Sequence, residues 1–279
     1  MTIPRLIGVI HLPPLAGAPG SHGKSPIEAL HEAGARAVEE AELLAREGFE
    51  GLIIENFGDT PFYKDRVPAE TIASMAIIAA AVREATADIS LGINILRNDA
   101  RSALAIASVT GCDWIRVNVL SGVTATDQGI IEGDAAWLLR ERERLHAHVA
   151  IFADVHVKHG VTLSSIDIGL AIEEAGTRAM ADGLIVSGPA TGQLIQPEML
   201  KVASEKAREI QVPLYIGSGA TADVLPELRP WVDGVIVSSA LRVGGIAGQP
   251  LDPARVKAFA RAFLKLGAKA KASGKAKRK

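Results

Sequence analysis

Eight short apolar runs recur along this chain of 279 residues, and a segment with helical spacing follows each of them. The runs have the length and composition of buried β-strands. In order, they are LIGVIHL from Leu6, GLIIEN from Gly51, ISLGINI from Ile89, WIRVNV from Trp114, VAIFADVHV from Val149, GLIVSG from Gly183, PLYIGSG from Pro213 and GVIVSSA from Gly234. Strand followed by helix, repeated eight times, is typical of a (β/α)8 barrel.

Helix-start signals between the runs support this count. SPIE, at Ser25–Glu28, combines an N-cap serine, a proline at the first helical position and a glutamate three residues after the cap. Asn98, Asp134 and Asp252 can cap later helices. A doubly wound open sheet is the alternative, but HLPPLAG, at the end of the first run, lacks the expected G-x-G-x-x-G turn. We therefore predict an α/β fold, a single (β/α)8 TIM barrel over residues 1–266.

Basic residues are concentrated at the C-terminal end of the chain. The last fifteen residues, KLGAKAKASGKAKRK, hold seven Lys or Arg and no Asp or Glu, so the rest of the chain is more acidic than the formal net charge of −2 indicates. Such a low-complexity segment cannot bury a core, and we expect residues 267–279 to form a disordered tail. The tail is expected to solubilise the chain or to contact an anionic membrane weakly, and the acidic body argues against a dedicated nucleic-acid site.

The chain has one cysteine, Cys112, which excludes an intramolecular disulfide and a cysteine zinc cluster and favours a reducing compartment. The first apolar run is too short for a signal peptide, and no segment reaches ~18 apolar residues in a row. We expect a soluble, unprocessed, cytoplasmic homo-oligomer, with a peripheral position on the inner face of a membrane left open.

Polar residues end almost every apolar run. In a (β/α)8 barrel, the carboxyl ends of the strands form the catalytic mouth. The polar residues at these ends are His11, Glu55, Asn56, Asn94, Arg116, Asn118, Asp154, His156, Ser187, Ser218, Ser238 and Ser239. A single Asn or Ser at such a place can simply cap a loop, and Arg116 could form a structural ion pair with Glu55 or Asp154. Taken together, they predict a polar site at the mouth.

The segment DVHVKHG carries several ionisable groups at the end of the fifth run. Strand alternation places Asp154, His156 and Lys158 on one face, where they are costly unless paired or used. His156 suits acid–base work near neutral pH with Asp154 orienting it, while Lys158 could form a Schiff base or neutralise a substrate anion. We predict that these three residues, with Glu55 and Asn118, are catalytic. We assign substrate binding to His11, Asn94, Arg116 and Ser187.

Two glycine- and serine-rich turns follow the last two runs, IGSGAT at Ile216–Thr221 and VSSALRVGG at Val237–Gly245. The loops after strands seven and eight bind phosphate in many barrels, because small residues let backbone N–H groups approach the anion. The sequence therefore predicts a phosphate site, and therefore a phosphorylated small-molecule ligand. Its residues are Gly217, Ser218, Gly219, Ser238 and Ser239.

A divalent metal is an alternative use of the same acidic groups. Glu55, Asp154 and His156 could bind magnesium, manganese or zinc. No H-E-x-x-H motif occurs in the chain. The sequence therefore identifies no cofactor with certainty and leaves a divalent metal as the second hypothesis.

The chain resembles the BtpA family, also called BtpA/SgcQ, in seven segments that occur in order: VIHLPPLAGAPG, ENFGDTPFYKD, LGINILRND, IRVNVLSGVTATDQGIIEG, DVHVKHG, LIVSGPATG and IGSGAT. The resemblance runs from about Leu6 to Gly245, and the basic tail is where the chain departs from it. It implies a TIM barrel. It also implies kinship with a cyanobacterial member that is an extrinsic thylakoid factor needed for photosystem I accumulation, and with bacterial and archaeal members, some encoded beside sugar-utilisation genes.

Together, the residues predict an enzyme that acts on a phosphorylated sugar or nucleotide-like molecule by isomerase, lyase or hydrolase chemistry. The alternative implied by the resemblance is a non-catalytic assembly or regulatory factor of the photosystem I type, peripheral to a membrane. A chain that had lost its activity would lose the alignment of polar strand ends, which this chain keeps. The long stretch Leu120–Asp134 exceeds the usual connection and predicts a mobile lid.

Overall fold

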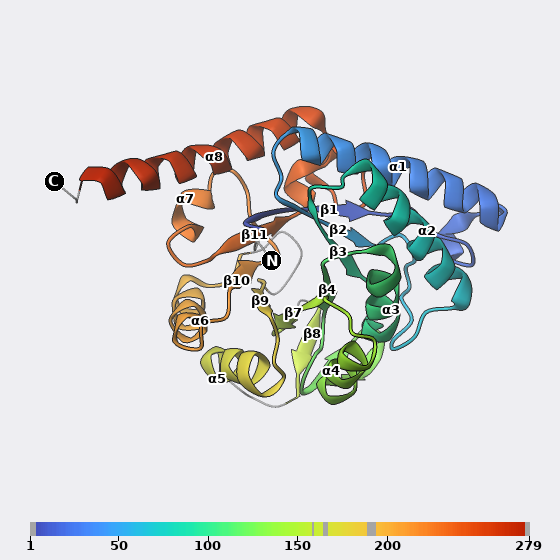
Figure 1. The fold of residues 1–279 in the computed structure, drawn as a ribbon, viewed down its shortest axis with the longest axis horizontal. Coiled ribbons are helices and arrows are strands. Elements are labelled where there is room, and N and C mark those ends of the chain that lie inside the picture. The colour runs from blue at the N-terminus through green and yellow to red at the C-terminus, as the bar shows by residue number, and fades with distance from the viewer. Residues whose placement is uncertain (1–3, 158, 164–166, 189–193, 277–279) are drawn as a thin grey trace.

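The computed structural model describes residues 4–157, 159–163, 167–188 and 194–276. Eight parallel strands close into a barrel with helices on its outside (Figure 1). In order round the barrel, the strands are β1 (Leu6–His11), β2 (Gly51–Glu55), β3 (Ser90–Asn94), β4 (Trp114–Val117), β7 (Ala150–Val155), β9 (Gly183–Val186), β10 (Leu214–Ile216) and β11 (Gly234–Val237). Each apolar run contains one barrel strand, so the predicted (β/α)8 fold is confirmed.

The helices are α1 (Pro26–Arg46), α2 (Ala69–Ala85), α3 (Ala100–Thr110), α4 (Ala135–Arg144), α5 (Ile168–Glu173), α6 (Pro197–Glu209), α7 (Leu225–Leu228) and α8 (Pro253–Ala276), with short 3-10 or π turns at Pro19–Ser21, Glu174–Arg178, Ser239–Leu241 and Val243–Gly245. Ser25 and Glu28 form the predicted capping box of α1. Asp134 and Asp252 cap their helices as predicted. The predicted cap of α3 is wrong by one residue, because Asp99 accepts the N–H of Ser102.

Large aromatic side chains fill the barrel below its mouth. The rings of Trp114 and Phe152 lie 4.8 Å apart, and Tyr215 packs 5.1 Å from Phe152. Glycines on neighbouring strands make room for them, since a Cβ on Gly92 would lie 2.4 Å from the Trp114 ring and one on Gly183 2.9 Å from Phe152. This aromatic layer fills the interior, so the polar space of the barrel lies at the carboxyl ends of the strands.

A small antiparallel sheet forms beside the barrel from β5 (Val123–Thr126), β6 (Gly129–Glu132) and β8 (Gly160–Thr162), in the order β6-β5-β8. The stretch 120–134, which the sequence predicted as a lid loop, contains the β5–β6 hairpin. Ile131 is buried against Val119 and Val157, which anchors the hairpin to the end of β4. The local sequence pattern could not predict this sheet, because β5 also pairs with β8. In the sequence, β8 comes only after the fifth barrel strand, β7.

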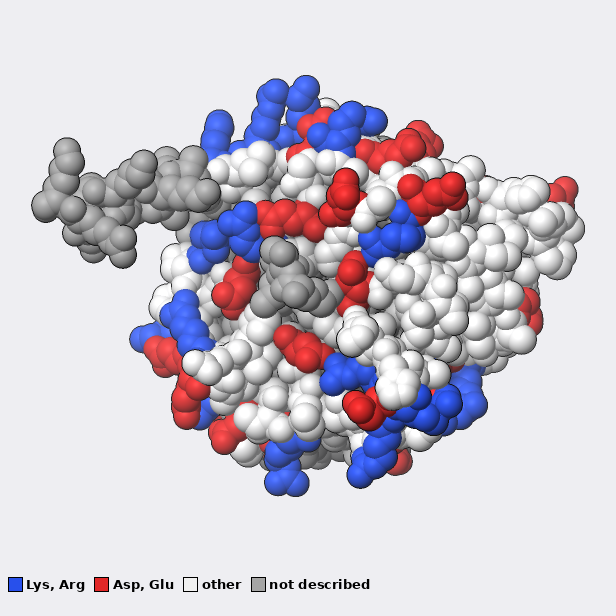
Figure 2. Space-filling model, in the orientation of Figure 1, with Lys and Arg blue, Asp and Glu red and all other residues white. Residues whose placement is uncertain are grey.

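Helix α8 extends past the predicted end of the barrel, as far as Ala276. The predicted disorder of residues 267–279 stays a prediction. Ala and Lys, which dominate this segment, both favour helix. The domain boundary between residues 266 and 267 stays a prediction. Acidic and basic side chains are interspersed over the described part of the face shown in Figure 2. Within the described chain, no helix combines the length and the apolar composition that crossing a membrane requires.

Candidate functional site

Arg116 of β4 lies at the centre of the mouth and joins carboxylates from two other strands. Its Nε and Nη2 donate to Asp154 of β7 at 2.9 Å each, and its Nη1 donates to Glu55 of β2 at 3.2 Å. All three side chains are buried. Burial by itself lowers the pKa of the Arg116 guanidinium, but the charges of Asp154 and Glu55 outweigh it and raise that pKa. The mouth therefore contains a permanently charged guanidinium.

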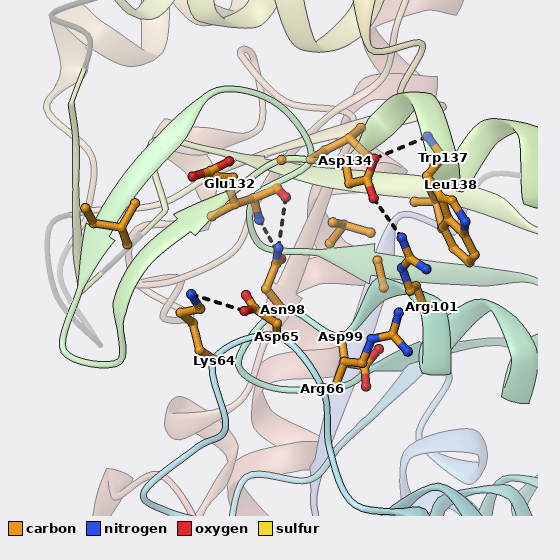
Figure 3. Close-up of a pocket in the computed structure, with 16 residues that line it drawn as sticks. Lys64, Asp65, Arg66, Asn98, Asp99, Arg101, Glu132, Asp134, Trp137 and Leu138 are labelled. Atoms are coloured by element: carbon orange, nitrogen blue, oxygen red, sulfur yellow. Dashed lines mark hydrogen bonds and ion pairs between the residues drawn. The ribbon is translucent and has the colours of Figure 1, made fainter.

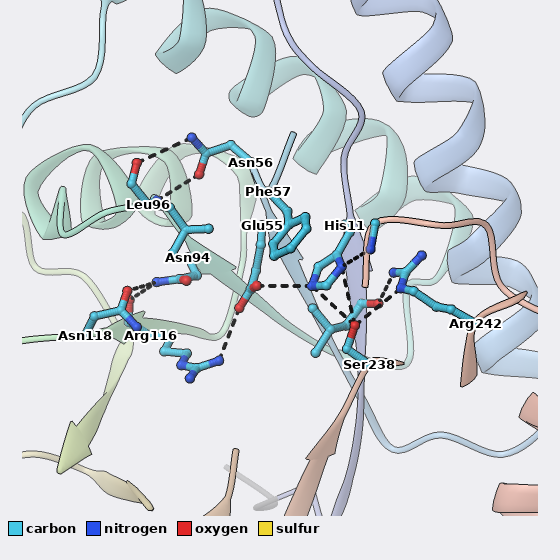
Figure 4. A network of polar contacts seen from close by, with 12 residues as sticks. His11, Glu55, Asn56, Phe57, Asn94, Leu96, Arg116, Asn118, Ser238 and Arg242 are labelled. Atoms are coloured by element: carbon cyan, nitrogen blue, oxygen red, sulfur yellow. Dashed lines mark hydrogen bonds and ion pairs between the residues drawn. The ribbon is translucent and has the colours of Figure 1, made fainter. Parts of the chain in front are cut away.

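Two asparagines extend this network to β3. Asn118 donates to Asp154 Oδ2 at 2.7 Å, and its own Oδ1 accepts from Asn94 Nδ2 at 3.2 Å. Asn94 also donates to the carbonyl of Arg116 at 2.9 Å (Figure 4). Strands β3, β4 and β7 are thus tied together by buried side chains. Asp154 accepts from both Arg116 and Asn118, so its carboxylate positions the guanidinium.

His11, the last residue of β1, faces Glu55. Its Nε2 lies 3.5 Å from Glu55 Oε2, its Nδ1 accepts the N–H of Gly248 at 3.1 Å, and its ring stacks on Phe57 with centroids 4.0 Å apart (Figure 4). Because Nδ1 is an acceptor, the proton of the neutral imidazole lies on Nε2, toward Glu55. The imidazole of His11 and the carboxylate of Glu55 therefore face each other at the mouth.

Ser238 lies beside His11 and is held by a buried arginine that the sequence did not single out. Its Oγ is 3.2 Å from His11 Nε2 and accepts from Arg242 Nε at 3.3 Å. The guanidinium of Arg242 donates to both oxygens of Glu40 on α1, at 3.1 and 3.2 Å, and to the carbonyl of Val9 at 2.7 Å. Burial lowers the pKa of Arg242, although the charge of Glu40 raises it.

The sequence alone indicates that Glu40 needs a buried partner. Glu40 falls on the face of α1 that buries Ala33, Ala37 and Ala41. A carboxylate on such a face needs a buried cation as its partner. Which cation it meets depends on the closure of the barrel, since Arg242 follows the last strand.

The loops after β10 and β11 meet the charged network round one cavity. It is lined by Val9, His11, Glu55, Phe57, Arg116, Gly217, Ser218, Gly219, Ala220, Ile236, Val237, Ser238, Ser239 and Ala247. All five predicted phosphate residues are among them. Gly219 has a φ of 79°, which favours glycine, and a Cβ on Gly217 would come within 2.8 Å of Ser187 Oγ. The structure thus brings the predicted phosphate loops against His11, Glu55 and Arg116.

His156 does not continue the face of Asp154 as predicted. Strand β7 ends at Val155, and His156 has a φ of 53°, so the alternation of the strand stops before it. His156 lines a different cavity, together with Asp154 and Asn118. Lys158 lies outside the described residues. Asn56 has the loop-capping role, because its Oδ1 accepts the N–H of Leu96 at 2.8 Å.

A second buried cation of the mouth, Arg97, was also passed over in the sequence, where it follows the third run in LGINILRND. Burial lowers the pKa of its guanidinium, while the charge of Asp154 raises it. The third apolar run had drawn attention to Asn94 and Asn98 instead.

The three residues predicted as metal ligands, Glu55, Asp154 and His156, do not form a cluster of free donors in the structure. Among the described residues, no group of three or more His, Cys, Asp or Glu side chains is arranged to hold a metal ion. Arg116 stands between Glu55 and Asp154 and compensates both charges. A divalent ion would have to take both carboxylates as its own ligands, in place of Arg116. The metal hypothesis stays a prediction, and no step below depends on it.

Comparison with solved structures gives the same fold at low sequence identity. Thiamine phosphate pyrophosphorylase from Pyrococcus furiosus superposes with a TM-score of 0.56 at 13% identity, covering 94% of this chain and 96% of that one. Phosphoribosyl anthranilate isomerase from Thermus thermophilus gives 0.56 at 10% identity, over 94% and 99% of the two chains. A 3-hexulose-6-phosphate synthase gives 0.54 at 17% identity, over 92% and 99%. These likenesses show a shared TIM-barrel fold.

Sequence relatives match at much higher identity. The photosystem I biogenesis protein BtpA of Synechocystis is 44% identical over 268 residues, which cover 96% of this chain and 90% of that protein. An uncharacterised protein of Methanocaldococcus jannaschii is 42% identical over 90% of this chain and 92% of its own length. The model of the BtpA family matches residues 2–265. On this evidence the chain belongs to the BtpA family.

Proposed function

We propose that this protein is an enzyme that acts on a phosphorylated sugar or nucleotide-like small molecule at the mouth of its barrel. One observation carries the proposal: a single cavity is lined by the loop residues 217–220, by Ser238 and Ser239, and by His11, Glu55 and Arg116. A phosphate held by the loops would place the rest of the molecule against the ionisable groups. The solved structures of similar fold support a phosphorylated ligand by their names alone.

Proton transfer is assigned to His11 and Glu55. Imidazole exchanges protons readily near neutral pH, and the two side chains lie 3.5 Å apart between Nε2 and Oε2. Arg116 supplies a fixed positive charge that would stabilise an oxyanion developing on the substrate. Asp154 acts through Arg116, whose guanidinium donates to it, and Asn118 acts through Asp154, to which it also donates. A proton-transferring pair beside a fixed positive charge suits isomerase or lyase chemistry, in which a proton moves next to a polarised carbonyl.

Two buried polar atoms at the mouth favour a hydroxylated ligand. Asn94 Oδ1 and Ser187 Oγ have no hydrogen-bond partner among the described residues. Buried polar atoms are usually paired, and leaving one unpaired costs about 1–3 kcal/mol. Substrate hydroxyl groups would provide the missing partners, which supports a sugar phosphate more than an apolar ester.

The second candidate is a non-catalytic assembly factor. The observation that favours it is the name of the Synechocystis relative, a photosystem I biogenesis protein at 44% identity. The two candidates differ in what they require of the mouth. Assembly by surface contact would tolerate loss of ligand binding there, whereas the enzyme would not.

Calorimetric titration with inorganic phosphate, ribose 5-phosphate and ribose tests the first candidate. We expect both phosphates to bind and to raise the melting temperature, since a ligand at 100 times its Kd adds about 2.7 kcal/mol of stability. Ser239→Asp places a negative charge in the cavity and should abolish this binding. Ser108→Asp, on α3 outside the cavity, is the matched control and should bind as the wild type does. The proposal fails if neither phosphate binds, or if Ser239→Asp binds them unchanged.

A further inference from the structure

A larger cavity, of about 550 Å³, lies on the outer side of β4 (Figure 3). The strand separates it from the mouth, because Arg116 points inward to Asp154 whereas the next residue, Val117, lines the outer cavity. Its walls come from residues 64–66, the starts of α3 and α4, and the β5–β6 hairpin. His11 and Glu55 belong to the lining of the other cavity. The outer cavity is therefore a separate place for a ligand.

The outer cavity combines apolar walls with a charged rim. The apolar side chains that a ligand can reach there are Ile130, which is 52% exposed, and the half-buried ring of Trp137. Its basic side chains are Lys64, Arg66 and Arg101. Ligand cavities in proteins commonly have volumes of about 300–1,000 Å³, so this cavity is large enough for a small organic molecule.

Arg101 is held in place on this rim before any ligand binds. Its guanidinium carbon lies 3.7 Å from the centroid of the Trp137 ring, and its Nη2 donates to Asp134 Oδ2 at 3.0 Å. Asp134 in turn caps α4 by accepting the N–H of Trp137. A guanidinium fixed in this way loses little conformational entropy when it meets an anion.

Three of the four carboxylates that line the cavity already have partners. Asp65 pairs with Lys64 at 3.2 Å, and Asp134 pairs with Arg101. Asp99 is buried and accepts hydrogen bonds from the backbone N–H of Val67 and from Ser102. These acidic groups therefore satisfy local contacts.

Arg66 and Glu132 differ from these groups. Neither forms an ion pair within the described part of the chain, and Figure 3 shows Glu132 across the cavity from Arg66 and Arg101. The charge that a ligand meets is therefore unevenly distributed. The side with the two arginines favours an anionic group, and the apolar walls favour a planar or aliphatic body.

We infer that the outer cavity is a binding site for an organic anion, a molecule with a carboxylate or phosphate group on a planar apolar body. Arg66 and Arg101 bind the anionic group, and the body packs on Ile130 and Trp137. This site is independent of the function proposed for the mouth, because β4 separates the two cavities.

Calorimetric titration with 2-naphthoate tests the inference, with the neutral 2-naphthamide as a comparison probe. We expect 2-naphthoate to bind at one site per chain and the amide to bind at least about tenfold more weakly, because a hydrogen bond to a charged group contributes about 1.5–3 kcal/mol. Arg66→Gln and Arg101→Gln should each weaken 2-naphthoate binding about tenfold. Arg66 is exposed, so its variant should fold normally.

Two further variants locate the bound probe. Arg140→Gln removes an exposed cation of α4 that does not line the cavity, and should leave the affinity unchanged. Ser239→Asp alters only the mouth and should also leave it unchanged. The inference is overturned if 2-naphthoate does not bind saturably, if both cavity arginine variants bind it as the wild type does, or if Ser239→Asp removes the binding.

Discussion

Arg116 donates two parallel hydrogen bonds to Asp154, from Nε to Oδ2 and from Nη2 to Oδ1, both at 2.9 Å. The side chains come from β4 and β7 and are 3% and 1% exposed. A two-point contact of this kind fixes the plane of the guanidinium as well as its position. The third donor of Arg116 then reaches Glu55 on β2. Asp154 therefore determines where the positive charge of the site lies.

Replacing Asp154 with Asn should destabilise the protein strongly. The change removes a buried negative charge and leaves Arg116 with Glu55 as its remaining carboxylate, and breaking a buried ion pair typically costs about 3–5 kcal/mol. Urea denaturation measures this loss as a lower midpoint. Asp65→Asn, which removes an exposed partner of Lys64, is the control and should change stability by less than about 1 kcal/mol. A variant of Asp154 with wild-type stability would show that the bridge does not support the fold.

Gly92→Ala should destabilise the barrel by about 1–3 kcal/mol through overpacking. The added Cβ would lie 2.4 Å from the Trp114 ring, a contact that forces the ring or the strand to move. Gly34→Ala on α1 is the matched control, since the nearest atom to its new Cβ is 3.8 Å away, and it should be neutral or slightly stabilising.

A double variant tests whether the Trp114 ring causes the loss of stability in Gly92→Ala. If the Trp114 ring is responsible, Gly92→Ala combined with Trp114→Phe should cost less than the sum of the two single changes in thermal denaturation. Strict additivity would mean that the strain lies elsewhere.

Cys112 should react with alkylating reagents only after the protein unfolds. Burial raises the pKa of its thiol from 9.0 to about 11, so at pH 9 about 1% of the native thiol is ionised compared with about half in the unfolded chain. Because the unfolded chain loses this proton first, the contribution of Cys112 to stability is complete below pH 9 and falls by about 1.4 kcal/mol per unit between pH 9 and 11. Mass spectrometry after iodoacetamide treatment, with and without denaturant, measures the difference in labelling. Equal labelling in both states would contradict it.

Backbone amides of β5 should exchange slowly with deuterium even without ligand. Thr124 lies between Ile131 of β6 and Thr162 of β8, so the strand has a partner on each side. A central strand is protected by hydrogen bonds that an edge strand lacks. Exchange measured by mass spectrometry on peptides covering 123–132 tests this. Exchange as fast as in an unfolded peptide would favour the mobile lid that the sequence predicted.

The sequence by itself determined the barrel and much of the composition of its mouth. Strand and helix follow from local periodicity, so all eight barrel strands and the cap of α1 could be placed from short windows of sequence. The carboxyl ends of parallel strands meet at one end of a barrel, so His11, Glu55 and Arg116 could be assigned to one site without knowing their contacts.

Only the tertiary structure decided which of these groups contact one another. Glu40 meets Arg242 across 202 positions of sequence, and β5 pairs with β8 across another strand. His156 leaves the face of Asp154 because a single backbone angle, a φ of 53°, ends the strand before it. The periodicity of apolar and polar residues predicts which face of a helix or strand a side chain occupies. The partner of a buried charge is decided when the chain closes on itself, because the cost of burying that charge is offset only by a group brought close in the folded state.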